Sequence, residues 1–98
     1  MIQFMPFAIC TLKFRIDHAD SLKEKRAILS SLLTRLKKLN LSVIESDFQD
    51  THKLIGLEIG IVRANRELLN KDLQSLQGII EKEFPNLYNY DFSKEIYS

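Results

Sequence analysis

The sequence predicts an α+β protein with a ferredoxin-like βαββαβ fold, in which a four-stranded antiparallel sheet carries two helices on one face. The chain has 98 residues, which is the length of one domain, so we expect a single domain over residues 1–98. Two segments place apolar residues at helical spacing, and four others have the alternation or the β-branched composition of strands. Right-handed crossovers between these elements would put both helices on the same face of the sheet.

The first strand is predicted over residues 7–16, where inward apolar and outward polar side chains alternate. The first helix follows a polar turn. Ser21 is its expected N-cap, and Glu24, three positions later, completes a capping box that satisfies two backbone N–H groups. Leucine and isoleucine then form one apolar stripe. Asn40 tolerates the left-handed conformation and is expected to end the helix.

The second half of the chain supplies the remaining elements. Residues 41–48 predict a strand whose broken alternation suggests a bulge, and residues 54–62 alternate well, so the two together predict a hairpin. A second helix is predicted over residues 65–84, with Asn65 as its N-cap. Residues 87–97, which are rich in aromatic side chains, predict the last strand. We expect the first and third strands, the most apolar of the four, at the centre of the sheet.

Composition narrows the class of protein. With 45% hydrophobic and 28% charged residues, the chain is typical of a globular protein. Cys10 is its single cysteine, which excludes an internal disulfide and argues against a small secreted scaffold. The sequence contains neither a run of about 18 apolar residues nor a signal peptide. We therefore expect a cytoplasmic protein with no membrane partner.

Positive charge is concentrated in the first predicted helix. Residues 21–39 hold six cations and one acid, a net charge of +5, which leaves −4 for the rest of the chain. Cations at the start of a helix are disfavoured by the helix dipole, by about 0.3–1 kcal/mol each at low salt. One interpretation is an anion site at this helix. The other is that these side chains pair with Asp17, Asp20 or Glu45 and have only a structural role.

The anion-site interpretation names five residues, which are Ser21, Lys23, Lys25, Arg26 and Lys37. Lys23, Arg26 and Lys37 fall within about 60° of one another on the helical wheel, and no acid interrupts them. Basic and hydroxyl side chains suit a nucleic-acid backbone, which they contact without reading its sequence. An ordinary solvated helix face has the same composition, so the pattern alone leaves both interpretations open.

The chain also resembles the bacterial YlxP-like family of unknown function. The resemblance rests on Ser-Leu-Lys-x-Lys-Arg at the start of the first helix, on Arg-Leu within it, and on a later Asn-x-Ser-Val-x-Glu followed by Gln-Asp. The matching positions are Ser21, Leu22, Lys23, Lys25, Arg26, Arg35, Leu36, Asn40, Ser42, Val43, Glu45, Gln49 and Asp50. Ile44 and Thr51 depart from the family pattern, which often has a small residue and an aromatic residue there. The resemblance implies a ferredoxin-like fold and, through neighbouring genes for translation and ribosome maturation, an RNA-related role. No catalytic activity is established for this family.

The outward face of the predicted sheet suggests self-association. Many RNA-binding domains of this topology stack bases on aromatic residues of the two central strands. The third strand presents Gly56, Glu58 and Gly60 outward, so the sequence disfavours that mode. Phe7 and Ile9 would instead leave a flat, partly apolar surface, and a homodimer would cover it.

Catalytic motifs are not found in the sequence. His18 and His52 lie in separate polar loops without metal-ligand spacing, and Cys10 points to the core side of its strand. We expect a non-enzymatic protein without a cofactor that binds RNA or a ribosome-associated partner through the first helix. The alternatives are a dimeric sensor of a small anionic metabolite and a protein-interaction module.

Overall fold

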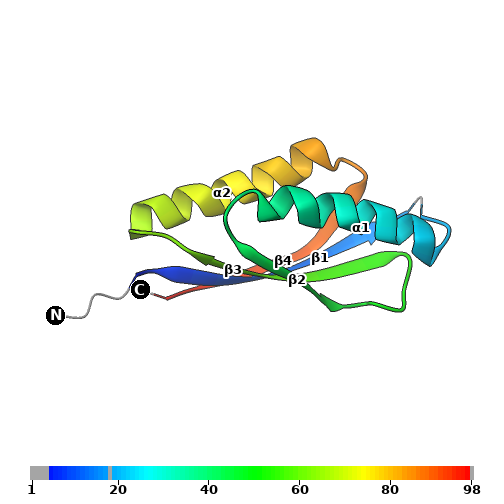
Figure 1. The fold of residues 1–98 in the computed structure, drawn as a ribbon, viewed down its shortest axis with the longest axis horizontal. Helices are drawn as coiled ribbons and strands as arrows, with labels where there is room; N and C mark the ends of the chain where they lie inside the picture. The colour runs from blue at the N-terminus through cyan, green and yellow to red at the C-terminus, as the bar shows by residue number, and fades with distance from the viewer. Residues whose placement is uncertain (1–4, 18, 98) are drawn as a thin grey trace.

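The protein, represented by a computed structural model, is described over residues 5–17 and 19–97. Its elements are β1 (Phe7–Ile16), α1 (Leu22–Lys37), β2 (Ser42–Asp47), β3 (Leu54–Val62), α2 (Arg66–Glu83) and β4 (Leu87–Tyr97). The strands form one antiparallel sheet in the order β2-β3-β1-β4. Both helices lie on the same side of this sheet, and within the described residues no further element covers its other face (Figure 1). These findings confirm the ferredoxin-like βαββαβ fold with β1 and β3 at the centre.

Alternation along β1 produces the core. The apolar residues at every second position from Ala8 to Ile16 are all buried, and β3 contributes Ile55, Leu57, Ile59 and Ile61 in the same way. The helices cover this layer with buried leucine and isoleucine side chains, namely Leu29, Leu32 and Leu36 from α1 and Leu69, Leu73, Leu76 and Ile80 from α2. Full burial of such a side chain contributes roughly 1.5–3 kcal/mol, so this face of the sheet provides most of the driving force for folding.

The β2–β3 hairpin contains the bulge that the sequence suggested. Its register shifts between Glu45 and Asp47, and β2 ends at Asp47, one residue before the predicted end. The bulge brings the backbone of the connection close to Gly56 on β3. A Cβ atom at Gly56 would lie 2.8 Å from the Cβ of Asp47 and 3.2 Å from a ring carbon of Phe48. Only glycine allows this approach.

Helix ends follow the capping residues, with two differences from the prediction. The Ser21 hydroxyl accepts a hydrogen bond from the Glu24 backbone N–H at 3.2 Å, but the Glu24 carboxylate accepts from the backbone N–H of Asp20 at 2.6 Å rather than from that of Ser21. At the other end, α1 stops at Lys37, and Asn40 has a φ of 59°. The helix therefore ends two residues before Leu39, because the chain turns there towards Asn40, which adopts the left-handed conformation.

Candidate functional site

The five residues predicted for the anion site separate into two groups. Lys25 is 1% exposed, whereas Lys23, Arg26 and Lys37 are exposed on the outer side of α1 and Ser21 caps the helix. The division follows helical geometry. Lys25 lies on the same face of α1 as the buried residues Leu29, Leu32 and Leu36. Leu29 and Leu32 follow it at the (i, i+4) and (i, i+7) spacings of one helix face, and this face is directed towards the core.

Inside the protein, the Lys25 ammonium group has three partners. It donates hydrogen bonds to the backbone carbonyl oxygens of Phe48 at 2.5 Å and Thr51 at 2.7 Å, and its nitrogen lies 3.4 Å from a carboxylate oxygen of Glu45. Two of the three N–H donors of the ammonium group therefore bond carbonyl oxygens, and its charge is paired with that of Glu45. We therefore exclude Lys25 from the surface that could meet a phosphate, and the pairing with Glu45 agrees with the structural interpretation for this residue.

Lys25 holds the β2–β3 connection in an unusual conformation. Phe48 has a φ of 63°, which is strained for a bulky side chain and costs about 1–3 kcal/mol. Its carbonyl accepts from Lys25 and also from the Thr51 backbone N–H at 3.1 Å, while its own N–H donates to a carboxylate oxygen of Asp47 at 2.8 Å. Because Lys25 binds backbone carbonyls here, the departure from the family pattern at Thr51 leaves the contact intact.

The N-terminus of α1 is closed by the chain's own groups. Ser21 uses its hydroxyl oxygen as the N-cap acceptor, and the Glu24 carboxylate lies at the helix start, where it bonds the Asp20 N–H. This negative group interacts favourably with the positive end of the helix dipole. An external anion would therefore compete with Glu24 at the helix end, and the outer side of α1 is the better candidate surface.

Four cations on that outer side, Lys23, Arg26, Lys37 and Lys38, are exposed, and each lacks a hydrogen bond or ion pair within residues 5–17 and 19–97. We call them the outer cations. Arg26 and Lys37 flank a shallow groove of about 260 Å³, in which Ser30 and Thr34 present hydroxyl groups and Leu29 and Leu33 form the floor.

Several other basic side chains of the described chain have acidic partners. Arg15 lies 2.9 Å from Asp17, and Arg63 donates to Asp72 at 2.5 Å. Arg35, although on α1, bridges to α2 by donating two hydrogen bonds to the Glu83 carboxylate at 2.7 and 2.9 Å. These bonds to the guanidinium group lower the pKa of Glu83. The outer cations thus differ from cations of the same protein that are neutralised internally.

Sequence patterns did not identify Arg63 or Phe48. Arg63 ties the end of α1 to β3, because its guanidinium donates to the carbonyl oxygens of Leu39 at 2.8 Å and Asn40 at 2.9 Å. Phe48 comes from the hairpin connection, yet its ring lies on the open face of the sheet, over Gly56 and 5.7 Å from the Lys13 ammonium nitrogen. The outward glycine was a signal for such a close approach, but it did not reveal which side chain covers it.

The open face of the sheet has two unlike ends. At the beginning of β1, Phe7 stacks on Tyr97 with ring centroids 4.8 Å apart, and Ile9 and Val62 are exposed beside them. At the far end, Arg15 lies over the ring of Tyr88 at 5.4 Å. Ile44, 60% exposed, adds to the apolar side of this face from β2.

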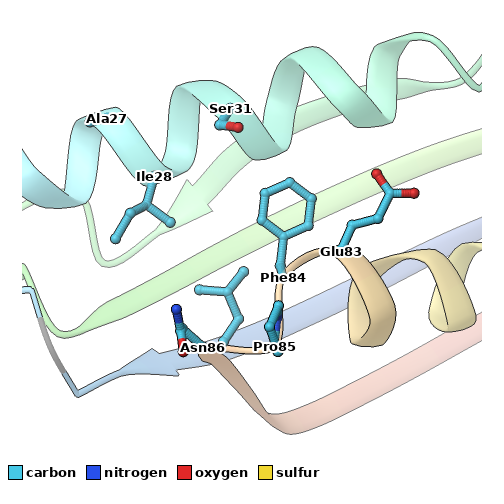
Figure 2. A pocket seen from close by; sticks show the side chains of 8 residues that line it. Ala27, Ile28, Ser31, Glu83, Phe84, Pro85 and Asn86 are labelled. Carbon is cyan, nitrogen blue, oxygen red and sulfur yellow. The ribbon is translucent and has the colours of Figure 1, made fainter.

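A second groove lies between α1 and the segment that joins α2 to β4. It has a volume of about 340 Å³, and its wall is mostly apolar, with Ala27 and Ile28 on one side and Phe84, Pro85 and Leu87 on the other. Figure 2 shows the Phe84 ring standing between α1 and the end of α2, with Ile28 directed into the same space. This groove suits a small apolar group rather than a phosphate.

The described residues contain few histidine and cysteine side chains that are able to carry out metal or thiol chemistry. In that part of the chain, His, Cys, Asp and Glu side chains form no group of three or more that could hold a metal ion. His18 lies outside the described residues. Cys10 is buried, and burial raises the pKa of its thiol, partly offset by the charge of Lys94. Neither of the described helices has the length and apolar character needed to cross a membrane.

Comparison with known sequences places the chain in a family. The family model described as "Protein of unknown function (DUF503)" matches residues 7–91. A relative from Bacillus subtilis (strain 168), named "Uncharacterized protein YlxP", is 40% identical over 73 residues, which cover 74% of this chain and 78% of the relative. The resemblance noted from the helix-start motif is therefore confirmed.

Comparison with solved structures supports the fold alone. The designed protein Foldit4 superposes with a TM-score of 0.58 at 9% identity, over 97% of this chain and 98% of its own. A designed ferredoxin-fold protein, LFR1 1, gives a TM-score of 0.50 at 14% identity, over 97% of this chain and 87% of its own. Both are designed sequences, so they show that this arrangement of elements is a stable fold and indicate no activity.

Proposed function

From the premise that the chain belongs to the DUF503 family of proteins of unknown function, which includes YlxP, we propose that it is a non-enzymatic, cytoplasmic module that binds RNA. The binding surface is the outer side of α1, and the ligand groups are backbone phosphates of RNA, free or within a ribosomal particle. Lys23, Arg26 and Lys37 provide the charge, and Ser30 and Thr34 provide hydroxyl donors between them.

One observation carries this proposal. The outer cations are exposed and have no acidic partner in the described chain, whereas Lys25 on the same helix is fully paired. A helix that only needed solubility would gain from intervening acids at (i, i+4) spacing, which stabilise by about 0.2–0.5 kcal/mol per pair. This surface lacks them between Lys25 and Lys37. The uncompensated charge is available to an anionic partner.

The length of the surface also suits a polyanion. Arg26 and Lys37 are 11 positions apart, which corresponds to about 16 Å along a helix. A nucleic-acid strand carries several phosphates over that distance. Three or four phosphate contacts are a small footprint, so the affinity is modest and falls steeply with salt.

Binding of a fluorescently labelled ribosomal RNA fragment tests the proposal. The triple variant Lys23→Gln/Arg26→Gln/Lys37→Gln removes three charges without touching the core, and we expect its affinity at low salt to fall at least about tenfold. The matched control is Lys71→Gln/Lys82→Gln, which removes exposed cations from α2 instead, and should leave binding nearly unchanged. An unchanged affinity in the triple variant would contradict the proposal, as would equal losses in both variants.

A second candidate function is the recognition of a small molecule, and the apolar groove beside α1 favours it. Ile28, Phe84 and Leu87 line a space of about 340 Å³, at the lower end of the volumes that small-molecule sites occupy. A thermal-shift screen of aliphatic and aromatic carboxylates, whose apolar part could enter this groove, separates the two functions. A compound that raises the melting temperature in the wild type but not in Ile28→Gln would favour this second function.

A further inference from the structure

We propose that a second copy of the chain covers the open face of the sheet, with the two-fold axis of the dimer running parallel to β1. The apolar end of this face is the starting point. Phe7, Ile9, Val62 and Tyr97 lie on three neighbouring strands, and each is between 39% and 59% exposed. A contiguous apolar surface of this kind on a sheet is typical of an interface.

The size of the face fits a dimer. β3, β1 and β4 together are about 14 Å wide, and the ten residues of β1 extend about 33 Å, which gives roughly 500 Å² in plan. Pleated strands with side chains have more accessible area than their plan area. The accessible area that would be buried on covering the whole face therefore approaches the roughly 800 Å² per partner of a standard interface. The apolar end alone is too small to reach this area.

Charge distribution selects the orientation of the second copy. If the axis ran across the strands through Thr11, Glu58 on β3 would face the partner's Glu58, and Glu95 on β4 would face the partner's Asp91. Like charges placed directly opposite each other are destabilising. The apolar end would also face the partner's Lys13. In this orientation, acidic residues would therefore face acidic residues, and apolar residues would face cations.

An axis parallel to β1 gives complementary pairs instead. β1 then lies on the partner's β1, and β3 lies on the partner's β4 at the same level of the register. Val62 faces the partner's Tyr97, Ile9 faces the partner's Ile9, and Glu58 faces the partner's Ser93. Glu95 meets the partner's Gly60, where a Cβ atom would find nothing within 4 Å, so the carboxylate enters an open space.

Two cations of β1, Lys13 and Arg15, meet their own like charge across this axis, because β1 lies on the partner's β1. Arg15 is 2.9 Å from Asp17 and lies over the ring of Tyr88, so its charge already has an acidic partner. The Lys13 ammonium group lies over the ring of Phe48, and Asp91 sits beside it at the same level of β4. Each lysine can therefore turn towards the partner's Asp91. The helices stay on the outer sides of the dimer, so the outer cations remain accessible and the dimer does not depend on the proposed RNA binding.

Sedimentation velocity over a concentration series tests the interface. The wild type is expected to be a dimer, and Val62→Lys or Tyr97→Glu should each raise the dimer dissociation constant at least about tenfold, which corresponds to 1.4 kcal/mol. Leu68→Lys is the matched control, because Leu68 is 36% exposed on α2, outside this face. Circular dichroism and melting curves confirm that each variant is folded.

Mixing the two interface variants tests the axis. With the axis parallel to β1, one ammonium group introduced at position 62 meets one carboxylate introduced at position 97, so an equimolar mixture of Val62→Lys and Tyr97→Glu regains the dimer. Failure of the mixture to associate would overturn the proposed axis. A monomeric wild type would overturn the whole proposal, as would a Val62→Lys variant that keeps the wild-type dissociation constant. RNA binding that is lost in Ile9→Lys but kept in the triple α1 variant would also overturn it.

Discussion

The inner and outer sides of α1 both carry cations, but the inner cation is buried and paired, whereas the outer ones are exposed and unpaired within the described residues. On the inner side, Lys25 is 1% exposed and bonded to two carbonyls and one carboxylate. On the outer side, Lys23 and Arg26, its near neighbours in sequence, have no partner in the described chain. In the short motif Ser-Leu-Lys-Glu-Lys-Arg, one cation therefore stabilises the fold and two remain exposed to solvent. Successive positions of a helix point in different directions, which separates these cations.

This difference shows which cations can be available for function. A buried ammonium group without partners would be very costly, so Lys25 must be satisfied by the protein itself. An exposed cation has no such requirement. Surface cations of this chain differ in this respect, since Arg15 and Arg35 have an acidic partner, whereas Lys71 and Lys82 on α2 have no hydrogen bond or ion pair within the described residues. The lack of an acid is informative on α1 because residues 26–36 contain no acid, whereas acids adjoin both lysines of α2 in the sequence.

Replacement of Lys25 is expected to have the largest effect on stability. Lys25→Met keeps the aliphatic stem but leaves the Thr51 carbonyl and the Glu45 carboxylate without the ammonium group, and the Phe48 carbonyl with the Thr51 N–H alone, so we expect a loss of about 3 kcal/mol. Urea unfolding measures it. The control is Lys23→Met, which should change the free energy of unfolding by no more than about 0.5 kcal/mol. Equal effects of the two substitutions would remove the distinction between the two sides of α1.

Replacement of Gly56 tests the connection that Lys25 holds. In Gly56→Ala the new methyl group would lie 2.8 Å from the Cβ of Asp47, so the bulge or the Phe48 ring must move. We expect a loss of about 1–3 kcal/mol, the usual cost of overpacking. Gly60→Ala on the same strand meets nothing within 4 Å in one protomer. It should show no such loss when thermal unfolding is measured at a concentration where the protein is monomeric.

Gly78 provides a contrast on the outer surface of α2. A Cβ atom there has open space around it, and the residue lies inside a regular helix. Gly78→Ala is expected to stabilise the protein by roughly 0.5–1 kcal/mol, because alanine is the better helix former. A lower melting temperature in this variant would indicate that something packs closely against this position.

Arg35 allows the smallest and most specific test, because it is a cation of α1 with an acidic partner. The Arg35 guanidinium lowers the pKa of Glu83 in the folded state, so this pair stabilises the protein fully above the ordinary pKa of a glutamate, about 4.3. Its contribution is lost as the pH falls through the lowered pKa. The difference in melting temperature between wild type and Glu83→Gln should therefore shrink towards zero in acid. A difference that grows as the pH falls would contradict this assignment.

Local patterns were sufficient to predict most of the fold. The period of two located β1, β3 and β4 within their observed bounds, and Ser21 and Asn65 marked both helix starts, because these signals depend on neighbouring residues only. The position of Phe48 could not be predicted in this way. It results from a bulge, a left-handed residue and a lysine 23 positions earlier in the chain, and such long-range contacts have no local signature.

The candidate site was predictable in part for the same reason. Helical periodicity alone showed that Lys23, Arg26 and Lys37 share a surface and that the stem of Lys25 points towards the apolar stripe. Glu45 was one of three acids that the sequence offered as partners of the cations at the helix start, but periodicity did not select it over Asp17 and Asp20, and it did not indicate Glu83, which comes from α2. The separation of paired from unpaired cations therefore required the tertiary structure.

The salt dependence of RNA binding tests the account most directly. Each phosphate contact contributes about −0.7 to −0.9 to the slope of log K against log salt concentration, so the slope for Lys23→Gln/Arg26→Gln/Lys37→Gln should be shallower than that of the wild type by about 2 to 3. Lys25→Gln, in a preparation shown to be folded, should keep the wild-type slope because its ammonium group is already bonded inside the protein. Equal slopes for the wild type and the triple variant would show that the outer cations do not contact phosphate.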